Sequence, residues 1–216
     1  MVRHALALED KQSRRETILA AARTLFVAGN GSLPAAAQIA VAAGLAKGTV
    51  YLYFRTKEEI FVALLLEGLL TLFNQIDATF AATKGGRSTK TAAFITTYVR
   101  YVDQRPDLLR LDTMSHSVLE KNLQPAKLRE FKLAFVVRLT ATSGLVEHAL
   151  RLAPGQGIPL LMRTFALTRG LWQSSHADEE PTAMANDPAL AALRPDFDRE
   201  LTEALTEYWR GALGRP

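Results

Sequence analysis

Apolar residues recur at three- and four-residue spacing along most of this chain, and that spacing limits what the chain can fold into. Residues 14–28, for example, carry Ile18, Ala22 and Phe26 on one helical face. Few stretches alternate apolar and polar residues, as half-buried strands do. The pattern therefore predicts an all-α protein.

Glycine and proline residues indicate where these helices begin and end. The expected helices cover residues 14–28, 34–43, 46–55, 57–83, 89–104, a short segment from 106, 125–152, 158–175 and 195–213. The segment HADEEPTAMANDP, from residue 176, is polar and rich in turn-forming residues, so we expect a loop there.

Composition excludes several classes of protein. The 216 residues have a mean hydropathy of +0.03 and no Cys, so neither a disulfide framework nor a thiolate metal site is expected. The four His show no HxxxH or HExxH spacing, and we predict no metal and no cofactor. The charged N-terminus does not resemble a signal peptide, and we expect no apolar run of the roughly 18 residues that span a bilayer. These features indicate a cytoplasmic protein without a membrane segment.

The excess positive charge lies near the N-terminus. Residues 1–60 hold eight Lys or Arg against five Asp or Glu, whereas residues 61–216 hold 18 against 17. This asymmetry favours a polyanionic partner for the N-terminal part. A basic face that is merely solvated is the alternative.

Two short expected helices, 34–43 and 46–55, are joined by a tight turn at Gly44. This is the helix-turn-helix pattern. Val50 and Phe54 are four residues apart and are expected to face the core, which leaves Tyr51 and Tyr53 on other faces. Flat side chains with polar ends suit contacts with base edges or phosphates. Packing of the two tyrosines on neighbouring helices is the alternative.

Residues 15–66 resemble the DNA-binding domain of the TetR (tetracycline-repressor) family, through ILAAARTLF and QIAVAAGLAKGTVYLYFRTKEEIF. The resemblance implies a three-helix helix-turn-helix DNA-binding domain, residues 1–56, and a larger helical ligand-binding and dimerisation domain, residues 57–216. It also implies a homodimeric repressor that binds a palindromic operator in double-stranded DNA and leaves it when a small ligand binds.

The DNA-facing positions that the resemblance implies are Lys47, Gly48, Thr49, Tyr51, Tyr53 and Lys57. The chain departs from the family pattern at 34–37, where Pro-Ala-Ala-Ala offers no polar side chain, and at Ala46, which cannot cap the third helix. Base recognition is therefore expected from the third helix. Phosphate or minor-groove contacts, or only a charged tail, are expected from Arg3, Lys11, Arg14 and Arg15.

Two helices near the C-terminus carry more apolar residues than a single buried face needs, which predicts a four-helix bundle across a twofold axis. The expected dimer interface comprises Leu160, Leu167, Leu171, Phe197, Leu201, Leu205 and Trp209. Packing within one chain is the alternative.

The expected effector is small and mostly apolar, with Arg169 or Arg138 available for an anionic or carbonyl group. The candidate pocket residues are Tyr98, Met114, His116, Phe131, Phe135, Met162, Phe165, Arg169 and Trp172. Plain core packing is the alternative for each of them.

An enzyme and a helical adaptor are the remaining alternatives. No nucleophile has a base at useful spacing, and GGRSTK lacks the GK[ST] order of a phosphate-binding loop. The sequence therefore predicts a regulator and not an enzyme.

Overall fold

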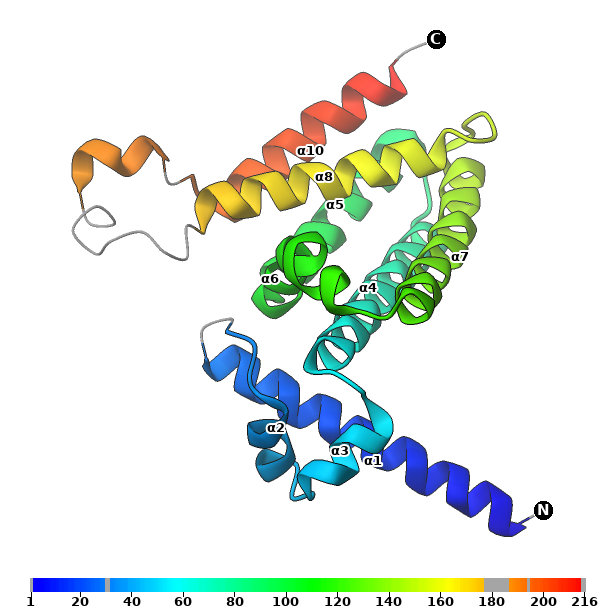
Figure 1. Ribbon diagram of the computed structural model, residues 1–216. Coiled ribbons are helices and arrows are strands. Elements are labelled where there is room, and N and C mark those ends of the chain that lie inside the picture. The colour runs from blue at the N-terminus through cyan, green and yellow to red at the C-terminus, as the bar shows by residue number, and fades with distance from the viewer. Residues whose placement is uncertain (1, 30–31, 177–186, 194, 215–216) are drawn as a thin grey trace. The chain divides into compact units, whose positions relative to one another are not determined.

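The computed structural model describes residues 2–29, 32–176, 187–193 and 195–214, and every regular element in these ranges is a helix (Figure 1). The all-α prediction is confirmed. The elements are α1 (Val2–Ala28), α2 (Ala36–Ala42), α3 (Lys47–Tyr53), α4 (Lys57–Ala82), α5 (Arg87–Asp103), α6 (Pro106–Met114), η1 (Ser115–Leu119), η2 (Glu120–Asn122), α7 (Pro125–Leu150), α8 (Gly157–Ser175), η3 (Pro188–Leu193) and α10 (Phe197–Leu213).

Most helix boundaries lie close to those predicted from the sequence, with two differences. Helix α1 begins at Val2 and not at residue 14, so the basic N-terminal segment is helical. Helix α6 continues into one π-helical turn, η1, and one 3-10 turn, η2, before α7 begins. Residues 177–186 of the expected loop lie outside the described ranges.

The chain forms two compact units. The first comprises Met1–Gly68 and Arg110–Ala134, and the second comprises Leu69–Leu109 and Phe135–Pro216, so α4 and α7 contribute to both. The first turns of α4 belong to the first unit because they help to form its core: the rings of Phe61 and Phe26 are 5.5 Å apart. The domain boundary expected between residues 56 and 57 falls at the start of α4 and stays a prediction.

The first unit buries the residues that helical spacing assigned to its core. Ile18 and Phe26 of α1, Ile39 of α2, and Val50 and Phe54 at α3 are all buried. The face of α3 opposite Val50 is left for solvent.

The second unit is built around α5, α8 and α10, and Figure 1 shows α8 and α10 running alongside each other. Trp209 is fully buried, with its ring 4.6 Å from that of Phe94, and its Nε1 donates a hydrogen bond to Thr164 Oγ1 at 3.0 Å. A second buried bond of 2.8 Å joins Tyr98 and Thr168 through their hydroxyl groups. These pairs satisfy polar groups inside an apolar core, which otherwise would cost about 1–3 kcal/mol each.

The structure corrects the expected dimer interface. Leu160, Phe197, Leu201, Leu205 and Trp209 are buried within one chain, because α10 packs on both α5 and α8. This apolar stripe is therefore core, the alternative that the sequence left open. Of the other two expected interface residues, Leu167 and Leu171 are half-buried.

Two described helices, α4 and α7, are long and apolar enough to cross a membrane by length and composition, with mean hydropathies of 1.6 and 1.2. From the sequence we expected no such run. In α4, 56% of the apolar window is buried, as in the core helix of a soluble protein, whereas in α7 the share is 28%. Helix α7 accordingly exposes Leu133, Val136 and Val137.

Candidate nucleic-acid interface

The turn between α2 and α3 is fixed by backbone geometry at Gly44. Gly44 adopts a φ of +66°, in the left-handed region that favours glycine. Its N–H donates to the Val41 carbonyl at 3.1 Å, and the Leu45 N–H donates to the Ala40 carbonyl at 2.9 Å. These two bonds form a Schellman motif, which ends α2 and directs the chain into α3.

Neither short helix has a side-chain N-cap. Ala35 and Ala46 occupy the two N-cap positions and make no side-chain cap hydrogen bond. Gln38 Oε1 accepts a hydrogen bond from the Ala35 N–H at 2.8 Å, which supplies half of a capping box. Gln38, the only polar residue of α2, thus stabilises the start of its own helix.

Helix α3 presents an exposed face without carboxylates. Lys47, Gly48 and Tyr51 are exposed, and Lys47 Nζ lies 6.0 Å from the centroid of the Tyr51 ring. Thr49, another expected contact, is half-buried. A cation beside an exposed aromatic ring at the start of a helix suits contacts with phosphates and base edges.

Sequence reasoning missed Leu52, which is 82% exposed on α3. Leu52 lies four residues after Gly48 and therefore shares its face of the helix, a spacing that the sequence does contain. An exposed apolar side chain on a recognition helix suits contact with a thymine methyl group.

The structure separates the two tyrosines that the sequence treated alike. Tyr51 is 44% exposed, whereas Tyr53 is half-buried and lines a cavity together with Phe54 and Glu59. Partial packing of Tyr53 was the alternative that the sequence left open.

The start of α4 is held by Thr56 and Glu59. Thr56 Oγ1 accepts a hydrogen bond from the Glu59 N–H at 3.3 Å, and Glu59 Oε2 accepts one from the Arg55 N–H at 2.8 Å. Lys57 is the first residue of α4 and is half-buried. A lysine beside helix N–H groups suits binding of a phosphate.

The basic residues of α1 have different surroundings. Arg14 forms an ion pair of 2.9 Å with Asp10, and Lys11 is exposed. The Arg15 guanidinium lies over the Phe54 ring, 5.5 Å from its centroid. The side chain of Arg3 lies outside the described residues.

The structure brings together three of the expected effector-site residues. Phe165 lies 6.3 Å from Tyr98 and 6.4 Å from Phe135, measured between ring centroids. Phe73, which the sequence did not assign to the pocket, lies within 5.8 Å of both Phe135 and Phe165. We call these four residues the aromatic cluster of the second unit.

Other expected pocket residues of the second unit do not belong to the aromatic cluster. Met162 is exposed, because it lies on the outer face of α8. Trp172 is buried with its ring stacked 3.5 Å from that of His176. Arg138, considered for an anionic ligand group, instead pairs with Asp77 at 2.6 Å. The expected residue Arg169 is half-buried on α8.

The remaining expected pocket residues, Met114, His116 and Phe131, belong to the first unit, not to the second. His116 is exposed and pairs with Glu120 at 3.2 Å, and Lys132 pairs with the same carboxylate at 2.8 Å. Burial would raise the pKa of Glu120, but the hydrogen bonds from Lys132 and His116 outweigh it and lower that pKa. Glu120, the first residue of η2, therefore connects η1 to α7 through His116 and Lys132.

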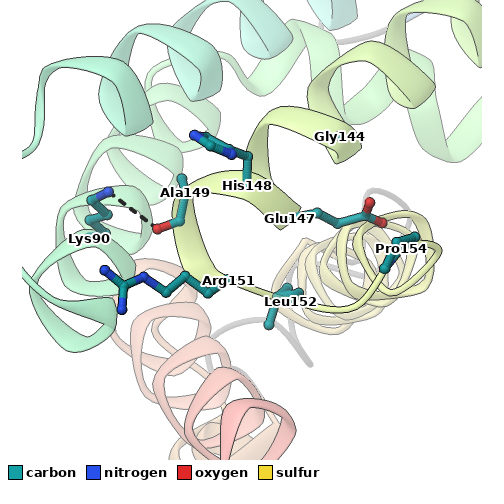
Figure 2. A pocket seen from close by; sticks show the side chains of 8 residues that line it. All are labelled: Lys90, Gly144, Glu147, His148, Ala149, Arg151, Leu152 and Pro154. Carbon is teal, nitrogen blue, oxygen red and sulfur yellow. Dashed lines mark hydrogen bonds between the residues drawn. The ribbon is translucent and has the colours of Figure 1, made fainter.

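A pocket of about 620 Å³ lies at the C-terminal end of α7 (Figure 2). Lys90 Nζ donates to the Ala149 carbonyl at 3.2 Å, and Arg87 donates to the Arg151 carbonyl at 2.6 Å, so both cations cap the end of α7. Glu147 is directed away from Lys90 and accepts hydrogen bonds of 2.9 and 2.8 Å from the backbone of the following turn. These polar groups hold the α7–α8 turn, and none of the expected effector residues lines this pocket.

Comparison with known proteins identifies both parts of the chain. Residues 18–64 match the family model described as "Bacterial regulatory proteins, tetR family". Residues 61–216, more than half of the chain, match the one described as "Tetracyclin repressor-like, C-terminal domain". No curated protein matches the chain.

Solved structures share the fold at low sequence identity. A TetR family transcription regulator from Marinobacter aquaeolei VT8 is 21% identical, with a TM-score of 0.56 over 94% of this chain and 97% of that one. The transcriptional regulator FadR from Bacillus subtilis, solved in complex with stearoyl-CoA, is 17% identical, with a TM-score of 0.54 over 88% of this chain and 96% of that one.

A helix-turn-helix module followed by a larger helical region defines a class of DNA-binding transcriptional regulators. Within that class, the chain belongs to the TetR family of bacterial regulatory proteins. The predicted family and the predicted DNA-binding regulator are confirmed, and this family is not enzymatic.

The turn at Gly44 can be tested by its backbone conformation. A Cβ at Gly44 would meet no atom within 4 Å, so Gly44→Ala is expected to cost only backbone strain, about 1–2 kcal/mol of unfolding free energy. Gly44→Asn should recover part of that loss, because Asn tolerates the left-handed region. Urea unfolding measures both variants, and equal stability of Gly44→Ala and the wild type would contradict the assigned turn.

Proposed function

We propose that the protein is a ligand-responsive repressor that binds a palindromic operator as a homodimer in the bacterial cytoplasm. The exposed, carboxylate-free face of α3 that bears Lys47 and Tyr51 carries the DNA-binding part of this proposal. Within this proposal, Lys47, Gly48, Tyr51 and Leu52 face the major groove, and Lys57 binds a phosphate.

Recognition of an operator is tested by comparing Tyr51→Ala with Lys57→Ala. Tyr51→Ala should weaken specific binding by about 1–3 kcal/mol, because it removes a contact with the bases. Lys57→Ala should weaken binding to all sequences alike and lower the salt dependence by about one ion. Fluorescence anisotropy with the DNA upstream of the gene measures both effects.

Gly48→Ala supplies an independent check on the same face. A Cβ at Gly48 meets no atom within 4 Å, and alanine favours a helix over glycine by about 1 kcal/mol. The variant should therefore be more stable than the wild type and yet bind DNA more weakly, because the added methyl group keeps DNA from the backbone. Wild-type affinity of both Tyr51→Ala and Gly48→Ala would contradict the assignment of α3.

For the homodimer, we propose an interface on the outer face of α8. Ile158 and Met162 are 36% and 43% exposed, and Ala166 and Gly170 continue the same face at four-residue steps. Small and apolar residues in this pattern allow two helices to approach closely. A dimer is needed because one helix-turn-helix reads only one half-site.

The interface is tested by placing a charge on one exposed face at a time. Met162→Glu should give a monomer in sedimentation velocity and should abolish operator binding, because it buries an unpaired charge between two copies. The control on another helix is Val137→Glu on α7, which changes an apolar residue that is 68% exposed and should leave the dimer intact. The reverse result would place the interface on α7.

The proposed effector is mostly apolar and binds at the aromatic cluster of the second unit. Tyr98, Phe135 and Phe165 support this assignment because large apolar side chains line most small-molecule sites. The related fold of the B. subtilis regulator with bound stearoyl-CoA makes long acyl chains the first ligands to test.

Stearoyl-CoA and free stearate serve as probes, with free coenzyme A as the control without an acyl chain. We expect the acyl compounds to release the operator, and Phe165→Ala to raise the concentration needed by about tenfold or more, because it truncates one ring of the cluster. Leu193→Ala, at an exposed position of η3, should behave as the wild type. Release that is indifferent to Phe165→Ala would contradict this location, and no release by either acyl compound would contradict the acyl-chain assignment.

A further inference from the structure

A second cavity lies in the first unit, at the C-terminal end of α3. It measures about 200 Å³. Helices α1, α4 and α7 and the C-terminal end of α3 all contribute to its wall. The charged and aromatic wall residues on which the choice of ligand depends are Arg15, Phe54, Glu59, Lys127, Glu130 and Phe131.

Glu59 provides the polar group that a ligand would contact. Its side chain is more than nine-tenths buried, at 8% exposure, and lines the cavity. Glu59 Oε2 accepts a hydrogen bond from the Arg55 N–H at the start of α4, but Oε1 is buried without a hydrogen-bond partner. A buried carboxylate oxygen without a donor is costly, so a group that donates a hydrogen bond there would bind favourably.

The other charged groups of the wall are already engaged with one another or with a ring. Lys127 Nζ pairs with Glu130 Oε2 at 2.7 Å, and the Arg15 guanidinium lies over the Phe54 ring. The rest of the wall consists of the Tyr53 ring with its hydroxyl group and of apolar side chains, which include Phe54 and Phe131. The cavity therefore combines one unmatched acceptor with aromatic walls.

We propose that this cavity binds a small organic ammonium ion. Its N–H group donates to Glu59 Oε1, and its apolar body lies against Phe54 and Phe131. A charge-assisted hydrogen bond to a carboxylate is stronger than a neutral one, and the aromatic wall suits the apolar body of the ligand. A cavity of about 150 Å³ accommodates benzene, so this one suits a single ring with a short aminomethyl arm.

This site goes beyond the effector site proposed at the aromatic cluster, because it belongs to the unit that contains the recognition helix. Tyr53 and Phe54 end α3, and Glu59 holds the start of α4. A ligand between these residues would fix the C-terminal end of α3, so its binding should change affinity for the operator.

Benzylamine is the probe, and isothermal titration calorimetry on the full chain is the measurement. Glu59→Gln keeps an oxygen for the Arg55 N–H but turns an amide donor toward the cavity, so it should weaken benzylamine binding by about tenfold or more. Ala63→Leu fills the cavity from α4 and should also weaken binding. The matched control is Ala20→Leu, which adds the same side chain at an exposed position of α1 and should bind as the wild type.

Benzyl alcohol and benzoate test which charge the site selects, and both should bind more weakly than benzylamine. At saturation, benzylamine should change the operator Kd of the wild type but not that of Glu59→Gln. The absence of saturable binding, unchanged binding in both Glu59→Gln and Ala63→Leu, or a preference for benzoate would each overturn the proposal. Operator binding without benzylamine is measured on the same samples, so a failure of the DNA-binding proposal is seen separately.

Discussion

Burial of Val50 and Phe54 in the core of the first unit determines what the rest of the chain can present to DNA. These residues are four apart, so their burial fixes the rotation of α3 about its own axis. Lys47, Gly48 and Tyr51 then lie on the exposed part of α3. The Schellman motif adds the second constraint, because it sets the direction in which α3 leaves α2.

Much of this could be read from the sequence because the information is local. Helical periodicity located the elements, and the Gly44 turn located the helix-turn-helix. The partial burial of Tyr53 could not be predicted in that way. Tyr53 lines a cavity whose wall includes residues from α1 and α7, and the spacing of residues within α3 does not indicate these neighbours.

The same reasoning explains the error in the expected dimer interface. The stripe from Phe197 to Trp209 shows that one face of α10 is buried, but not what covers it. One hydrogen bond answers that question in the structure. Trp209 needs an acceptor for its indole N–H, and Thr164 of α8 supplies it at 3.0 Å. Because an indole donor would otherwise be buried unpaired, α10 is held on its own chain.

The packing of α10 against α8 determines which face of α8 stays exposed. Once Leu160 and Thr164 face α10, the outer face of α8 carries Ile158 and Met162, which are apolar and exposed in a single chain. A contiguous patch of exposed apolar residues is typical of a site that contacts another protein. The buried stripe of the last helix thus points indirectly to the proposed interface: it fixes the rotation of α8, and that rotation selects the residues that a second copy would meet.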